Sequence, residues 1–144
     1  MKFLHVLAAI AWLGGISFML LALRPAAAAL LLPSERLPLM VQIMQRFFAL
    51  VWASIAVLVL TGLGMLLSVG MQHAPIDWHL MLGLGLLMAA LFGHLYFGPF
   101  RRLRQAVDTG NWPEGARRMG QIASLAGINL GLGVMAIAAV SFVL

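Results

Sequence analysis

The side chains of this sequence that can bind a metal ion are its histidines and methionines. The chain has four histidines, ten methionines and no cysteine. Imidazole binds haem iron, copper and zinc, and the methionine thioether prefers soft Cu(I) or serves as an axial ligand of haem. The absence of cysteine excludes disulfides, iron–sulfur clusters and thiolate zinc sites. The chemistry that these residues leave open is the binding of haem or of copper.

Four apolar segments must position these residues. The chain is 63% hydrophobic and only 9% charged, whereas globular proteins are about 25% charged. A bilayer core of about 30 Å needs roughly 20 apolar residues in a helix. The sequence therefore predicts an all-α polytopic membrane protein, an antiparallel bundle of four transmembrane helices forming a single domain over residues 1–144. The predicted spans cover residues 3–23, 47–69, 79–100 and 119–143.

The basic residues indicate how the bundle is oriented. The net charge is +5, and all nine basic residues except Lys2 are arginines. The arginines flank the first and third connections, whereas the connection over residues 70–78 has none. By the positive-inside rule the arginine side is cytoplasmic and both termini lie on the outer, periplasmic side. The positive charge is therefore explained by a lipid bilayer, with no nucleic acid as a partner.

The third connection contains the residues typical of a turn between two helices. Gly110 is typical of a helix end, and Asn111 is typical of the residue that caps the next helix. Glu114 follows Asn111 by three residues, as in a capping box. The sequence therefore predicts a tight helical hairpin here.

Depth along the helices places an outer layer of polar residues far from the arginines. At about 1.5 Å per residue, His5 and His79 lie roughly 28 and 33 Å from the arginine level. Met65 and Met81 fall at a similar depth, so His5 with His79 or with Met65 is the expected ligand pair. An alternative is that His73 and His79 merely lie among lipid headgroups. The connection above this layer adds His73, Met71 and Asp77.

An inner layer centres on His94, roughly 10 Å from the arginine level. His79 and His94 differ by about 60° around one helix, so both are expected to point inward. His5 and His94 differ by roughly 18 Å in depth, too far to bind the same iron atom. Alternatively, His94 donates a hydrogen bond to a carbonyl or hydroxyl, and the serines only allow close packing. The polar residues expected near this layer are Ser17, Ser54, Ser124 and, about 6 Å higher, Asn129.

Two packing patterns complete the set of candidate residues. Trp12 shares a helix face with His5 and is expected either to line the same space or to fill the core. Gly127 and Gly131 form a GxxxG pattern on the fourth span. This pattern indicates close helix packing, either within the monomer or at the interface of a homodimer.

Several motifs resemble the CopD family of bacterial membrane proteins. The run from Leu4 to Gly15 resembles the first helix of that family. The motifs Val59-Leu60-Thr61-Gly62, Trp78-His79-Leu80-Met81 and His94-Leu95-Tyr96-Phe97 are similar to its later helices. The resemblance implies a small four-helix protein of the bacterial inner membrane that handles or imports copper.

The sequence is also similar to the related HemJ-type protoporphyrinogen oxidases. Their first-helix histidine matches His5, their Arg-Pro pair matches Arg24-Pro25, and their later aromatic-His pair matches His94. Those enzymes bind haem b, which the similarity implies for this chain. Their third-helix lysine has no counterpart, because residues 81–85 contain no basic residue.

Three functions follow from these residues. The first is a haem b membrane protein that transfers electrons between a quinol or porphyrin and an acceptor, which as an enzyme would be a membrane oxidoreductase. The second, ranked close behind, is a copper transporter or copper-handling protein. The third is a non-catalytic accessory subunit of a membrane complex. Hydrolysis by a serine triad is not expected, because no acidic residue lies within a predicted span to orient a histidine.

Overall fold

Helices account for every regular element in the part of the chain that the structure describes. The computed structural model covers residues 2–70, 72–74 and 76–143, apart from the side chains at 77, 140, 142 and 143. This confirms the predicted all-α class. The elements are α1 (Lys2–Phe18), η1 (Met19–Leu23), α2 (Arg24–Leu30), α3 (Pro33–Val69), α4 (Ile76–Leu95), η2 (Tyr96–Phe100), α5 (Arg101–Asp108) and α6 (Trp112–Val143).

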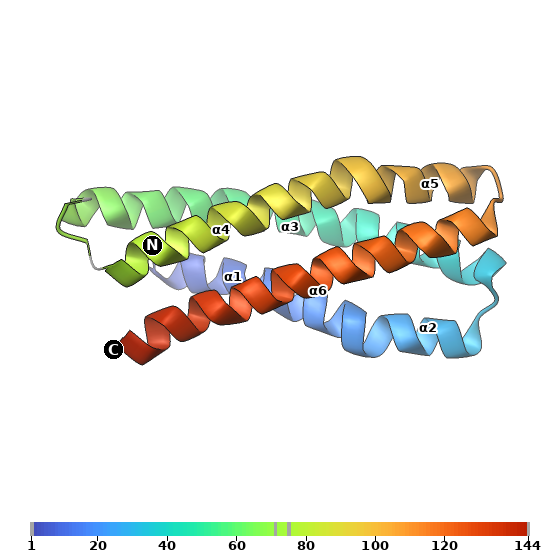
Figure 1. Ribbon diagram of the computed structural model, residues 1–144, viewed down its shortest axis with the longest axis horizontal. Helices are drawn as coiled ribbons and strands as arrows, with labels where there is room; N and C mark the ends of the chain where they lie inside the picture. The colour runs from blue at the N-terminus through green and yellow to red at the C-terminus, as the bar shows by residue number, and fades with distance from the viewer. Residues whose placement is uncertain (1, 71, 75, 144) are drawn as a thin grey trace.

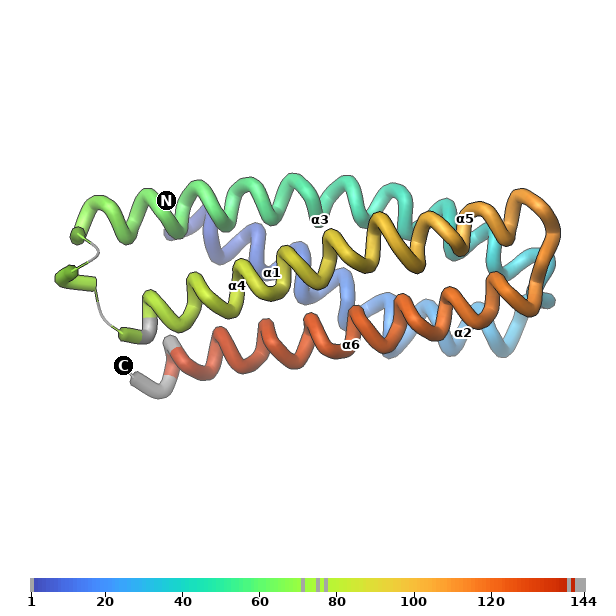
Figure 2. The backbone as a smooth tube through the Cα atoms, turned by 45° about the horizontal axis from the view of Figure 1, so that its top comes forward, coloured from blue at the N-terminus to red at the C-terminus, as the bar shows by residue number. Residues whose placement is uncertain are grey.

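The chain reverses direction at the two ends of an elongated bundle (Figure 1). Both termini and the turn between α3 and α4 lie at one end, which we call the terminal end. The α2–α3 and α5–α6 connections lie at the opposite end, which we call the arginine end; Figure 2 shows the same path after a 45° turn. The closest packing joins α1 to α3 and α4 to α6.

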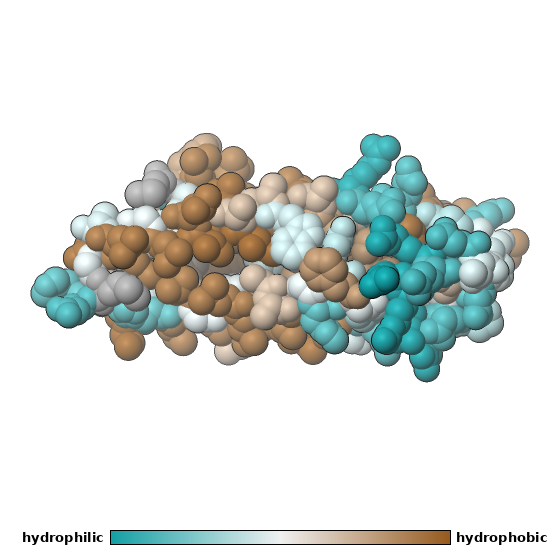
Figure 3. Space-filling view, turned by 90° about the horizontal axis from the view of Figure 1, so that it is seen from above, coloured by the Kyte–Doolittle hydropathy of each residue, from teal (hydrophilic) through white to brown (hydrophobic). Residues whose placement is uncertain are grey.

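Four stretches of the described chain are long and apolar enough to cross a membrane. Only 17–28% of their most apolar windows is buried, so most of their apolar surface faces outward. Hydrophilic residues gather at the arginine end, and hydrophobic residues cover much of the remaining length (Figure 3). The chain is therefore a multi-pass membrane protein. The four stretches are Lys2–Leu30, Pro33–Val69, Trp78–Asp108 and Trp112–Ala139.

The helices extend well beyond the predicted spans at the arginine end. Leu32 has an extended backbone, as expected before a proline, and Pro33 begins α3 because its missing N–H costs nothing at the first helical position. The first turns of α3 then bury Leu37, Met40 and Met44 against the rest of the bundle. This helical spacing of core residues is the reason that α3 starts 14 residues before the predicted span.

Short π-helical segments accompany two of the prolines, whereas Pro38 lies within α3 without one. Pro25 follows η1 and Pro99 lies within η2. A proline has no N–H and its ring clashes with the carbonyl four residues earlier, so the regular hydrogen-bond ladder is interrupted there. The wider π-turns allow the helices to continue past these positions.

Aromatic rings form the centre of the core between α3, α4 and η2. The ring of Phe48 lies 5.1 Å from that of Phe92 and 4.8 Å from that of Phe100, both in edge-to-face arrangements. Trp52 packs on Phe92 at 4.9 Å. Such offset contacts favour one relative position of the helices, and so they stabilise the framework that carries the polar residues.

The hairpin before α6 has the predicted capping geometry. Gly110 adopts a φ of +71°, the left-handed conformation that favours glycine. The backbone N–H of Glu114 donates to the Asn111 side-chain oxygen over 3.4 Å. The predicted cap at Asn111 is confirmed, and it directs α6 back along the bundle.

Gly14 and Gly15 provide a matched test of the packing between α1 and α3. A Cβ atom on Gly15 would overlap the ring of Phe47, whereas one on Gly14 would meet nothing within 4 Å. We expect Gly15→Ala to reduce the free energy of unfolding by about 1–3 kcal/mol, because the ring must shift. Gly14→Ala should be neutral or slightly stabilising, because alanine is the better helix former. Thermal unfolding in detergent measures both, and equal melting temperatures would contradict this packing.

Candidate functional site

His5 makes a hydrogen bond to a side chain of a different span. Its Nδ1 lies 2.8 Å from Oγ1 of Thr61, so that α1 and α3 are joined near the terminal end. The imidazole is half-buried, and Thr61 is 7% exposed. The predicted candidate His5 is therefore held against α3 by a specific partner rather than lying free at the surface.

The Thr61 hydroxyl determines which nitrogen of His5 carries hydrogen. Its oxygen lies 2.6 Å from the carbonyl of Val57, one turn earlier in α3, to which it donates its single hydrogen. The Thr61 oxygen can then only accept, so the Nδ1–H of His5 is the donor. The neutral imidazole consequently carries its lone pair on Nε2, the arrangement in which a histidine can ligate a metal through Nε2.

Gly62 and Met65 lie close to Thr61 along α3. A Cβ atom on Gly62 would lie 3.5 Å from Cε1 of His5, so the imidazole rests against the glycine backbone. Met65 is half-buried and follows Thr61 by four residues, which places it one turn along the same side of α3. The pairing of His5 with Met65 as ligands stays a prediction.

The other members of the predicted outer layer lie on α4 and in the turn before it. His79 and Met81 are half-buried in α4, and His73 is exposed in the turn. α4 packs mainly against α6, and α1 mainly against α3, so pairing of His5 with His79 stays a prediction. Met71, together with the side chain of Asp77, lies outside the described residues.

The inner layer differs from the sequence prediction. His94 is exposed and lines an open groove between α4–η2 and α6, so the expectation that it points inward is wrong. Ser124 lines the same groove. The Ser17 hydroxyl donates to the carbonyl of Leu13 within α1, and Ser54 is buried at 4% exposure in α3. The structure therefore joins His94 with only one of the three serines.

Asn129 and Trp12 have structural positions in the core. The Asn129 side-chain amide donates to the carbonyl of Met88 over 3.2 Å, which links α6 to α4. Its side-chain oxygen is buried with no partner among the described atoms. Trp12 is 3% exposed and packs edge-on against Phe92. Of the two roles expected for Trp12, the structure supports the filling of the core.

The glycine pattern on α6 faces outward. Gly127 and Gly131 are exposed, and a Cβ atom on either would meet nothing within 4 Å. Close packing within the monomer instead uses Gly133, where a Cβ atom would overlap Leu13. The prediction that the GxxxG pattern packs within the monomer is therefore wrong. The alternative, a homodimer interface, stays a prediction.

No group of three or more His, Asp or Glu residues in the described chain could hold a metal ion. Methionine, the other type of ligand in this chain, is not one of these residues. A site here would therefore combine one or two histidines with thioether sulfur. Sequence reasoning did not identify Thr61 as the partner of His5, although a hydroxyl within an apolar helix was a usable signal.

The His5–Thr61 contact predicts a measurable tautomer. We expect nitrogen-15 NMR of the neutral histidines to show hydrogen on Nδ1 of His5. Thr61→Val should reduce this preference about tenfold, because one hydrogen bond contributes about 0.5–1.5 kcal/mol. Thr61→Ser keeps the acceptor and serves as the control, and the exposed His73 is an internal reference. Hydrogen on Nε2 of His5 in the unchanged protein would contradict the assignment.

Most of this helical framework matches a known protein family. The family model described as CopD, copper resistance protein D, matches residues 41–143. No curated protein and no solved structure matches the chain. The match includes Thr61, Met65, His79 and His94, whereas α1 with His5 precedes it. Because the family model covers well over half of the chain, this membrane protein belongs to the CopD family.

Proposed function

We propose that this CopD family protein handles copper, taking up the ion as cargo at its terminal end through His5. The observation that carries the proposal is the hydrogen-bond chain from His5 through Thr61 to the Val57 carbonyl. These two hydrogen bonds leave the lone pair of the His5 Nε2 available and fix the orientation of the imidazole ring. Metal-ligating histidines commonly have such a partner on their second nitrogen.

The chemistry of the neighbouring side chains supports copper. Thioether sulfur selects soft Cu(I), and Met65 follows Thr61 by one turn of α3. Met81 and His79 of α4 are further proposed ligands, and His73 and Met71 are proposed to deliver the ion from the turn. His94 is proposed as a second station for the ion towards the arginine end. The family description, a copper resistance protein, favours this function over haem binding.

Haem b is the second candidate, because the same histidine nitrogen would bind haem iron. In this alternative His79 or Met65 is the second axial ligand, and the partner is a quinol or a porphyrin. The similarity to HemJ-type oxidases would then extend to membrane oxidoreductase activity.

The arginine distribution supports an orientation for either function. All the arginines lie in or beside the segments at the arginine end, where hydrophilic residues gather (Figure 3). By the positive-inside rule we place this end in the cytoplasm of a bacterium and both termini on the periplasmic side of the inner membrane. His5 would then face the compartment from which copper enters.

Copper binding can be tested by competition between the purified protein and a chromogenic Cu(I) chelator under anaerobic conditions. We expect His5→Ala to abolish binding and Thr61→Val to weaken it about 10–100-fold, because the second ring nitrogen loses its partner. Met65→Leu should also weaken binding. Met44→Leu is the matched control, because Met44 is fully buried in the same helix far from Thr61.

The same preparation distinguishes the alternatives. A Soret band that shifts on reduction with dithionite, together with no Cu(I) bound at micromolar levels, would replace copper with haem b. Wild-type cellular function in all four His→Ala variants would contradict both ligands and support the accessory-subunit hypothesis. Loss of copper binding in Met44→Leu would show that binding is lost through misfolding rather than through removal of a ligand, and would contradict the proposed ligand set.

A homodimer through α6 is proposed on the outward-facing Gly127 and Gly131. Because nothing lies within 4 Å of a Cβ atom at either position, a second helix can approach closely there. We expect Gly127→Leu with Gly131→Leu to abolish dimers measured by single-molecule photobleaching in liposomes. Gly83→Leu in α4, another position with open surroundings, is the control. A monomeric unchanged protein would contradict the proposal.

A further inference from the structure

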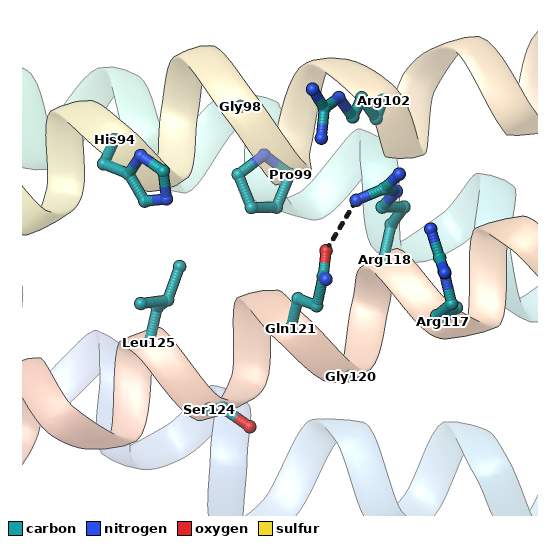
Figure 4. A pocket seen from close by; sticks show the side chains of 10 residues that line it. All are labelled: His94, Gly98, Pro99, Arg102, Arg117, Arg118, Gly120, Gln121, Ser124 and Leu125. Carbon is teal, nitrogen blue, oxygen red and sulfur yellow. Dashed lines mark hydrogen bonds between the residues drawn. The ribbon is translucent and has the colours of Figure 1, made fainter.

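A groove rich in arginine lies at the arginine end, away from His5. Its two walls come from different spans, α4–η2–α5 on one side and α6 on the other. Figure 4 shows the arginine, histidine and glutamine side chains that line it. The groove has a volume of about 720 Å³. The polar residues that line it are His94, Arg102, Arg117, Arg118, Gln121 and Ser124.

The charges of the groove are only partly compensated. Arg118 is 13% exposed and held by Glu114 at 2.7 Å and by the Gln121 side-chain oxygen at 2.9 Å. Arg117 shares the same carboxylate at 3.4 Å but is 63% exposed. Arg102 makes no ion pair with any residue that the structure describes. Three guanidinium groups therefore face one carboxylate, which leaves an excess of about two positive charges.

The hydrogen bonds of Arg118 fix the orientation of its guanidinium group. Glu114 and Gln121 flank Arg118 on α6 at i−4 and i+3, and so they fix the side chain in one position. Its remaining N–H groups, with those of Arg102, are donors of the geometry that phosphate oxygens accept. A preformed set of such donors needs less ordering when an anion binds.

Two glycines leave room for a ligand in the groove. A Cβ atom on Gly120 would meet nothing within 4 Å, and one on Gly98 would approach only the His94 ring, at 3.9 Å. The space beside Gly120 is therefore open, and a side chain introduced there would occupy the groove without entering the core.

Exposed apolar side chains continue from the groove towards the middle of the bundle. Leu87 of α4 is 48% exposed and Ile128 of α6 is 53% exposed. Leu87 precedes His94 by two helical turns and Ile128 follows Ser124 by one, so each lies on the same side of its helix as a groove residue. A ligand with an anionic head and an apolar tail can contact both surfaces together.

We propose that this groove is a binding site for a phosphate group, supplied by the headgroup of an anionic phospholipid. The phosphate accepts hydrogen bonds from Arg102, Arg117 and Arg118, and an acyl chain lies along Leu87 and Ile128. Basic pockets between membrane helices are suited to such headgroups. The three arginines that bind the phosphate are not among the proposed copper ligands, and the test does not involve a metal.

The test is native mass spectrometry of the detergent-purified protein titrated with phosphatidylglycerol or phosphatidylcholine. We expect retention of phosphatidylglycerol and little retention of phosphatidylcholine. Arg102→Gln with Arg117→Gln should weaken retention about 25-fold, since each arginine near a membrane surface contributes about fivefold. Arg24→Gln with Arg46→Gln removes the same charge from exposed positions outside the groove and should change retention less than about twofold.

A second pair of variants leaves every charge in place. Gly120→Leu fills the groove and should abolish retention, whereas Gly83→Leu places the same side chain at an open position of α4 outside the groove. Groove-dependent binding of inorganic phosphate without lipid retention would assign the site to free phosphate. Equal losses in the groove and control variants, or full retention in Gly120→Leu, would overturn the proposal.

Discussion

In the bilayer core no water is available to the backbone of this chain, so each amide must find its hydrogen bond within its own helix. The described chain accordingly leaves the helical conformation only at the two ends of the bundle (Figure 1). Pro25 and Pro99 each remove a donor from this ladder, and the π-turns η1 and η2 accompany them. The continuity of the helices is the condition on which the positions of all the polar side chains depend.

The same constraint governs those polar side chains. Thr61 and Ser17 donate to carbonyls of their own helices, whereas Asn129 reaches the Met88 carbonyl on a neighbouring helix. Each bond satisfies a polar group that would otherwise be costly in an apolar surrounding. For Thr61 the bond has a further consequence, because the hydroxyl oxygen becomes an acceptor and thereby orients His5. The candidate ligand is thus supported by the general requirement for satisfied hydrogen bonds.

The two ends of the bundle differ in chemistry. The terminal end has histidine and methionine near an uncharged threonine, which suits a soft metal ion or haem iron. The arginine end combines guanidinium groups with open space between α4–η2 and α6, which suits an anion. His94 belongs to the second environment although its residue type suggests the first. Residue type alone therefore did not assign this histidine to a site.

The sequence by itself determined the number of apolar helices, the concentration of charge at one end and the hairpin at Gly110 and Asn111. These features depend on composition and on contacts within a few residues. Only the tertiary structure decided that His5 meets Thr61, 56 positions away, and that Gly133 rather than Gly127 packs inside the monomer. The prediction that His94 points inward failed because α4 is apolar around its whole circumference. The angle between His94 and His79 around the helix therefore does not show which face of α4 is buried. The rotation of each helix is set by packing against its neighbours, and that information is not local in the chain.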